Sequence, residues 1–181
     1  ESVPYKAHDG IVAALSHHLR TLDGSTLRAI VPEHVDTLLD LFPVLARIPV
    51  FAHAPRTLDA VQSRKERRRR GFLALRDLLR SLGTQSTVIV AIDDLHWGDV
   101  DSVALLHELL RPPEQPRFFL VVTYRSDESE YSPALQALFE AEPDEHAVPV
   151  ERIELEAFDR ALSRALADQL LPQDTRARFA D

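Results

Sequence analysis

Two short runs of continuously apolar, β-branched residues constrain the fold of this chain more than any other feature. They are TVIVAI at 87–92 and FFLVVTY at 118–124, and a weaker run follows at 148–155. Strands that are covered on both faces of a parallel sheet have this composition, whereas a strand with one solvated face alternates apolar and polar residues. The sequence therefore predicts a mainly parallel sheet.

Helical patterns fill the intervals between these runs. Apolar residues that recur at spacings of three and four predict amphipathic helices. The expected spans are 6–22, one or two small helices within 33–54, about 57–82, about 101–110, 132–141 and 158–170. We expect Asp23-Gly24 to end the first helix and Gly83 to end the long one. Alternating strands and helices predict the α/β class, as a layered αβα sandwich with right-handed crossovers.

Composition excludes several classes of function. The 181 residues include no cysteine, which removes disulfides, thiol nucleophiles and cysteine-ligated zinc. A net charge of −8 argues against nonspecific binding to nucleic acid or to an anionic membrane. No apolar run approaches the length of a membrane span and the first residues do not resemble a signal peptide, so we expect a cytoplasmic protein. The absence of methionine suggests a piece of a longer polypeptide.

Two adjacent acids, Asp93 and Asp94, directly follow the run 87–92. Ligands of open α/β sheets gather at the carboxyl ends of the strands, so this pair lies where a site is expected. An apolar strand that ends in Asp-Asp resembles the Walker B element of P-loop NTPases, in which the first acid holds Mg²⁺ and the second polarises the attacking water. Strand ends also carry Asp as a turn former or helix cap, and the pair alone does not separate these interpretations.

A longer resemblance covers most of the chain. The stretch IDDLHWGDVDSVALLHELL at 92–110 resembles the Walker B region of STAND-class signalling ATPases, relatives of AAA proteins that use nucleotide state as a switch. The stretch FFLVVTYRSDE at 118–128 looks like the next strand and its sensor segment. Residues 1–19 and 66–83 are similar to STAND modules of bacterial serine/threonine protein kinases.

This resemblance implies roles for four residues. Asp93 would coordinate Mg²⁺ and Asp94 would orient or activate water. Arg125 would sense the terminal phosphate of ATP, with Thr123 as a lesser candidate. The parent protein would be linked either to a kinase or to a transcription regulator of the LuxR/MalT type.

One component of a P-loop ATPase is missing from the sequence. No Gly-x-x-x-x-Gly-Lys-(Ser/Thr) loop is present to hold the phosphates, and family order places that loop upstream of Glu1. We therefore expect residues 1–181 to be an incomplete P-loop NTPase core that does not hydrolyse ATP alone, with the last ~25 residues leading toward a lid or winged-helix region. Its partners would be the upstream Walker A segment and the effector domains. Exposed apolar strand faces would also permit self-association.

Other interpretations stay open. His96 with Asp93, Asp94 and Asp99 suits a transition-metal hydrolase, although so short a segment cannot easily converge on one ion. A protein-interaction module without nucleotide chemistry is the main alternative. We expect Trp97 to pack beneath the following helix rather than stack on a base. The run Arg67–Arg70 is expected to be a solvated helix face rather than an anion site.

Overall fold

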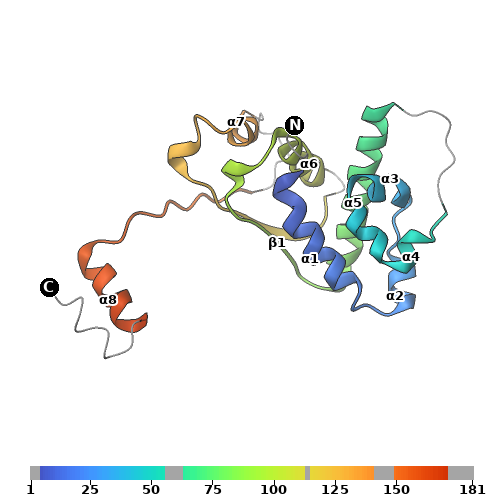
Figure 1. Cartoon of the computed structure of the whole chain (residues 1–181), viewed down its shortest axis with the longest axis horizontal. Helices are drawn as coiled ribbons and strands as arrows, with labels where there is room; N and C mark the ends of the chain where they lie inside the picture. The colour runs from blue at the N-terminus through green and yellow to red at the C-terminus, as the bar shows by residue number, and fades with distance from the viewer. Residues whose placement is uncertain (1–4, 56–62, 113–114, 141–148, 171–181) are drawn as a thin grey trace. The chain divides into compact units, whose positions relative to one another are not determined.

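The computed structural model describes residues 5–55, 63–112, 115–140 and 149–170, which fall into two compact units, 1–148 and 149–181 (Figure 1). The first unit contains α1 (Asp9–Leu19), α2 (Gly24–Ala29), α3 (Val35–Leu41), α4 (Pro49–Ala52), α5 (Arg64–Gln85), β1 (Val88–Ile92), α6 (Val100–Leu110), β2 (Phe118–Val122) and α7 (Pro133–Phe139). Short 3-10 turns lie at η1 (Lys6–His8), η2 (Pro43–Arg47), η3 (Leu95–Trp97) and η4 (Ser126–Glu128). None of the described helices is both long and apolar enough to cross a bilayer.

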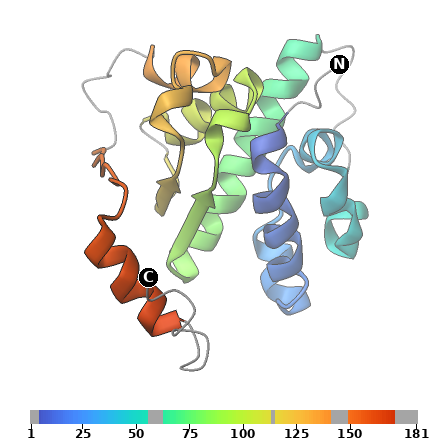
Figure 2. The same cartoon turned by 60° about the vertical axis from the view of Figure 1, so that its left-hand side comes forward.

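The two strongest apolar runs form the sheet, as predicted. Strands β1 and β2 pair in parallel from Val88 opposite Phe118 to Ile92 opposite Val122, and α6 lies between them in the chain. Figure 2 shows the two strands side by side. Alternate residues of β1, Val90 and Ile92, are buried on the face covered by helices. This mixture of helices and parallel strands confirms the α/β prediction.

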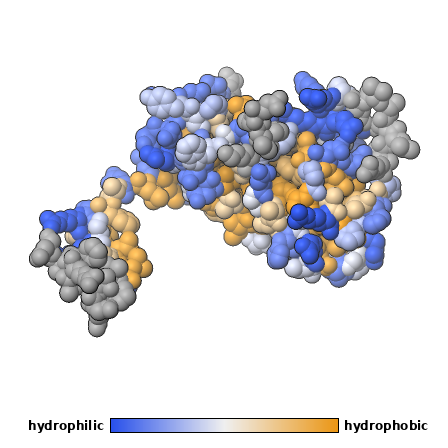
Figure 3. All heavy atoms as spheres, in the orientation of Figure 1, coloured by the Kyte–Doolittle hydropathy of each residue, from blue (hydrophilic) through white to orange (hydrophobic). Residues whose placement is uncertain are grey.

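The opposite face of the sheet is uncovered in the described residues. Ile89 of β1 is 67% exposed and its register partner Phe119 of β2 is 65% exposed, while Val121 is also exposed. Apolar surface is open to solvent on this unit in Figure 3. Among the described residues helices cover one face of the sheet, so the second helical layer of the predicted αβα sandwich is not seen there. The apolar strand face opposite the helices is exposed, as expected.

The main core lies among the helices. Phe72, Leu75, Leu79 and Leu82 form the predicted stripe of α5, and all four are buried. They share one apolar cluster with residues of α3, η2 and α4, the small helices predicted within 33–54. Pro43 and Pro49 begin η2 and α4, where a missing backbone N–H costs nothing.

Several predicted helix boundaries are wrong. The first helix, α1, ends at Leu19 rather than at Asp23-Gly24. The carboxylate of Asp23 instead accepts the N–H groups of Ser25 at 2.8 Å and Thr26 at 3.0 Å and thereby caps α2. Gly83 does not end α5, which continues to Gln85. A Cβ atom on Gly83 would lie 2.7 Å from the carbonyl oxygen of Arg117, so this glycine lets α5 approach the chain that enters β2.

The start of the long helix also differs from the prediction. Ser63 caps α5 by accepting the N–H of Glu66 at 3.3 Å, so the helix begins at Arg64. The predicted start near Thr57 lies outside the described residues.

The second unit contains α8 (Arg160–Leu170), within the helix predicted at 158–170. The weak strand predicted at 148–155 does not form in its described part; residues 149–159 have no regular secondary structure. A short strand is stable only when a neighbouring strand accepts and donates its backbone hydrogen bonds. Within the part of the chain that the structure describes, no strand pairs with residues 149–155.

Candidate functional site

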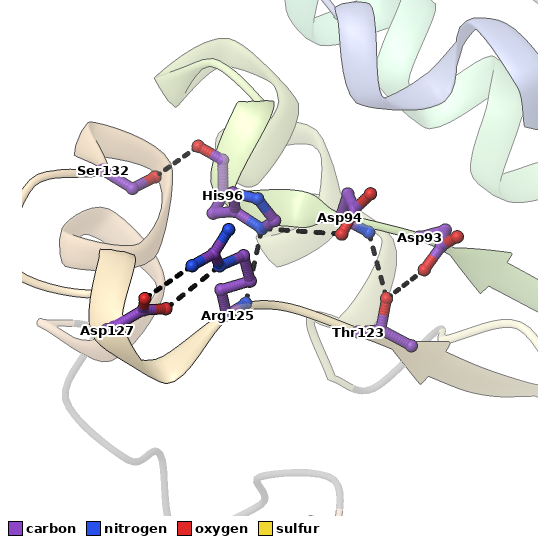
Figure 4. A network of polar contacts seen from close by, with 7 residues as sticks. All are labelled: Asp93, Asp94, His96, Thr123, Arg125, Asp127 and Ser132. Atoms are coloured by element: carbon purple, nitrogen blue, oxygen red, sulfur yellow. Dashed lines mark hydrogen bonds and ion pairs between the residues drawn. The ribbon is translucent and has the colours of Figure 1, made fainter. Parts of the chain in front are cut away.

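Polar residues from both strands meet at the carboxyl edge of the sheet. The acid pair, Asp93 and Asp94, follows β1, and Thr123 and Arg125 follow β2. Figure 4 shows Thr123 beside the acid pair, with Arg125 farther along the same loop. The parallel pairing of β1 and β2 explains this arrangement, because parallel strands end at the same edge.

Every polar group of Thr123 bonds to the segment 92–95, which contains the acid pair. Its N–H donates to the carbonyl of Ile92 at 2.9 Å, and its own carbonyl accepts the N–H of Leu95 at 2.9 Å. Its hydroxyl accepts the N–H of Asp94 at 3.0 Å and donates to the carboxylate of Asp93. Thr123 thus orients Asp93 and fixes the turn after β1, a role that the sequence analysis did not predict.

The turn at Asp94 gives the pair its shape. Asp94 has the left-handed backbone conformation, with φ 53° and ψ 46°, which Asp tolerates better than most residues. Both carboxylates are exposed to solvent, so water or a ligand can reach their oxygens. Two adjacent carboxylates are the kind of donor that Mg²⁺ binds together with water and phosphate oxygens.

A transition-metal site is less well supported. Among the described residues no three His, Asp or Glu side chains converge as a metal-ligand set. His96 is 7% exposed, and its Nδ1 atom lies 3.8 Å from Asp94 Oδ1, too far for a hydrogen bond. The hydrolase alternative therefore gains no support from the geometry.

His96 instead joins the two strand ends to α7. Its Nδ1 atom accepts the backbone N–H of Arg125 at 3.4 Å, and its carbonyl accepts the hydroxyl of Ser132 at 2.9 Å. Ser132 in turn accepts the N–H of Leu135 and caps α7. Ser132 was not predicted from the sequence, although a serine before a proline at a helix start is a recognisable capping signal.

The candidate sensor, Arg125, is paired with a neighbouring acid. Its Nε donates to Asp127 Oδ1 at 3.1 Å and its Nη2 to Asp127 Oδ2 at 2.6 Å. These bonds raise the pKa of Arg125 and lower the pKa of Asp127 below its usual value. In Figure 4 the guanidinium points toward Asp127 rather than toward Asp93. Asp127 was not predicted from the sequence, although it follows Arg125 by two residues.

Asp99 and Ser102 have a structural role. Asp99 caps α6 by accepting the N–H of Ser102 at 2.8 Å, and it also accepts the N–H of Tyr5 at 3.3 Å. The hydroxyl of Ser102 accepts the N–H of Ala7 at 3.3 Å. These two residues therefore fasten the chain before α1 to the start of α6.

Trp97 does not pack beneath α6 as predicted. It is 68% exposed, and its ring lies against that of His96 with 5.2 Å between the ring centroids. The buried positions of the η3 turn are taken by Leu95 and His96, which leaves Trp97 on the outside.

A groove of about 950 Å³ runs beside β1. Apolar residues of α1 and α5, including Ile11, Leu15 and Leu82, line it together with the continuous segment 86–94. Because consecutive residues of β1 contribute, the groove follows a strand edge that β2 does not cover. The acid pair and Trp97 also line it.

Each arginine of the run Arg67–Arg70 lies within 4 Å of a carboxylate. Arg67 pairs with Asp40 of α3, and Arg68 pairs with Asp101 of α6 at 2.7 Å. Arg69 and Arg70 both lie near Glu66, at 3.9 Å and 3.2 Å. The first two arginines thus link α5 to neighbouring helices, and an anion site here would have to compete with these carboxylates.

The chain belongs to the AAA ATPase domain family, because residues 2–122 match the family model described by that name. Membership implies a nucleotide-binding domain that uses ATP and Mg²⁺ in general. The match includes the acid pair and ends at Val122, immediately before Thr123. Searches of curated proteins and of solved structures gave no match.

Proposed function

We propose that this chain is the downstream part of the ATP-binding switch domain of a bacterial STAND-class signalling protein in the cytoplasm, linked to a serine/threonine kinase or a transcription regulator. The observation that carries this proposal is the hydrogen-bonding of Thr123, which connects the acid pair after β1 with the loop that carries Arg125 after β2. Membership of the AAA ATPase domain family supports it independently.

Each residue of the site has a task suited to its chemistry. Asp93 would hold Mg²⁺, with Thr123 fixing the orientation of its carboxylate. Asp94, exposed at the turn, would orient the attacking water. Arg125 would bind the terminal phosphate through its planar donor fork. The metal, when bound, would neutralise charge on the phosphate oxygens.

The loop that binds the phosphates would come from an upstream Walker A segment of the same parent chain. A strand from that segment would lie in the groove, along the edge of β1 that no described strand pairs with. Further helices would cover the exposed sheet face with Ile89 and Phe119. Effector domains of the parent would be its other partners. The chain alone would then lack the groups that neutralise the triphosphate.

Steady-state hydrolysis of ATP with Mg²⁺ tests the function. We expect turnover by the full-length gene product and none by the 181-residue chain. Asp94→Asn in the full-length protein should lower kcat by about 100-fold or more, since a group that positions or activates water contributes at least that much. Glu130→Gln, which removes one exposed negative charge from the loop before α7, should leave kcat unchanged. Magnesium-dependent turnover by the 181-residue chain would contradict the proposal.

A protein-interaction role is the second candidate, because the exposed sheet face is apolar. Sedimentation of the 181-residue chain with and without Phe119→Ser separates the two. Tight self-association that the variant abolishes, together with no ATP binding by the full-length protein, would favour the interaction role. A full-length protein that binds ATP favours the switch domain.

A further inference from the structure

We infer that Asp127 is a positioning residue that competes with the terminal phosphate for Arg125, so that nucleotide binding requires Arg125 to exchange one anion for another. This inference rests on the proposed function. It starts from the two hydrogen bonds between Arg125 and Asp127, at 3.1 Å and 2.6 Å. A carboxylate bound in this way uses the same guanidinium edge that a phosphate group uses.

The backbone of Arg125 is held more firmly than its side chain. The backbone N–H of Arg125 donates to the buried His96, and the backbone carbonyl of Arg125 accepts the N–H of Glu128 at 3.2 Å. Its side chain is 61% exposed, and that of Asp127 is 65% exposed. The backbone is therefore fixed while the guanidinium is accessible, so exchange of partners requires only side-chain rotation.

The next residue provides a matched comparison. Glu128 also carries a negative charge near Arg125 and raises its pKa through space, but the hydrogen bonds and the larger effect come from Asp127. Removing either charge makes the same change in net charge. Only removal of the Asp127 charge releases the guanidinium edge.

The competition is expected to be moderate in strength. Exposed ion pairs contribute little to stability, and the corresponding penalty on a competing anion is about two- to fivefold in affinity. Asp127 would therefore weaken binding of the phosphate without preventing it. It would also keep Arg125 oriented away from Asp93 while no nucleotide is bound.

Calorimetric titration of the full-length protein with ATP and Mg²⁺, at fixed ionic strength, tests the inference. Asp127→Asn should tighten binding about two- to fivefold, whereas Glu128→Gln should change it by less than about 1.5-fold. Arg125→Gln should weaken binding, and adding Asp127→Asn to that variant should have no further effect. In the protein without nucleotide, the NMR resonance of the Arg125 Nε–H should move in Asp127→Asn and stay in place in Glu128→Gln. A purely structural role for Asp127 would not produce this pattern.

The possible failures are distinguishable. If Arg125→Gln weakens ATP binding while Asp127→Asn and Glu128→Gln behave alike, the inference is wrong and the proposed function stands. If no variant and no wild-type protein binds ATP, the proposed function fails and the inference fails with it. Equal thermal unfolding of the variants shows that the differences are not due to loss of fold.

Discussion

Protonation of His8 should make the stability of this fold sensitive to mild acid. His8 is 1% exposed in the η1 turn before α1, and neither ring nitrogen has a hydrogen-bond partner in the described structure. Burial lowers its pKa from 6.5 to about 4, although the carboxylate of Asp99 acts in the opposite direction. His8 is therefore neutral in the folded state at pH values where the unfolded chain already binds a proton.

The sign and size of the effect follow from this difference. Between pH 6.5 and 4 the unfolded state binds more protons than the folded state, so stability falls as the pH falls. The full contribution is present above pH 6.5, and the loss is complete below pH 4. At about 1.4 kcal/mol per pKa unit, the shift corresponds to about 3 kcal/mol in the free energy of unfolding.

Urea unfolding of wild type and His8→Leu at several pH values between 7 and 4 measures this contribution. The variant should lose about 3 kcal/mol less than wild type over that range. It should also be no less stable at pH 7, because it removes two buried polar atoms that lack partners. His17→Leu, at an exposed position of α1, is the control and should keep the wild-type pH dependence. If His8→Leu and wild type lose stability in parallel, the description of His8 as a buried neutral side chain is wrong.

Two further substitutions test how the site and the sheet are held. In urea unfolding, Thr123→Val should lower the free energy of unfolding by about 1 kcal/mol, because it removes the hydroxyl that bonds to both Asp93 and Asp94. Thr123→Ser keeps a hydroxyl and should be close to wild type. In thermal unfolding, Gly83→Ala should lower the stability of the fold by about 1–3 kcal/mol, because its Cβ would meet the backbone of Arg117. Gly10→Ala has open space at its Cβ position and should be neutral or slightly stabilising. Equal stability of the two alanine variants would contradict the close approach of α5 to β2.

Apolar pattern was sufficient to predict the sheet but not its surroundings. The runs at 87–92 and 118–124 identified β1 and β2, because continuous β-branched residues have few other folded environments. The run at 148–155 was weaker, and a strand also needs a partner that a local pattern does not provide. Gly83 illustrates the same limit, since it lies inside α5 where a Cβ atom would clash with Arg117, which is distant in sequence.

The position of the candidate site could be predicted, but its internal contacts could not. Strand direction alone places Asp93, Asp94 and Thr123 at one edge. The contacts of Thr123 depend on register, because a shift of one residue would turn its hydroxyl to the other face. The exposure of Trp97 depends on which side of the η3 turn faces the core, and residue type does not decide that.

Binding of Mn²⁺, used as a spectroscopic substitute for Mg²⁺, tests most directly whether the acid pair serves a metal–triphosphate. Electron paramagnetic resonance of the full-length protein with ATP measures the affinity for the ion. Asp93→Asn should weaken that affinity by at least about tenfold, while Glu130→Gln should leave it unchanged. Equal affinities for the two variants would contradict a role of Asp93 as a metal ligand.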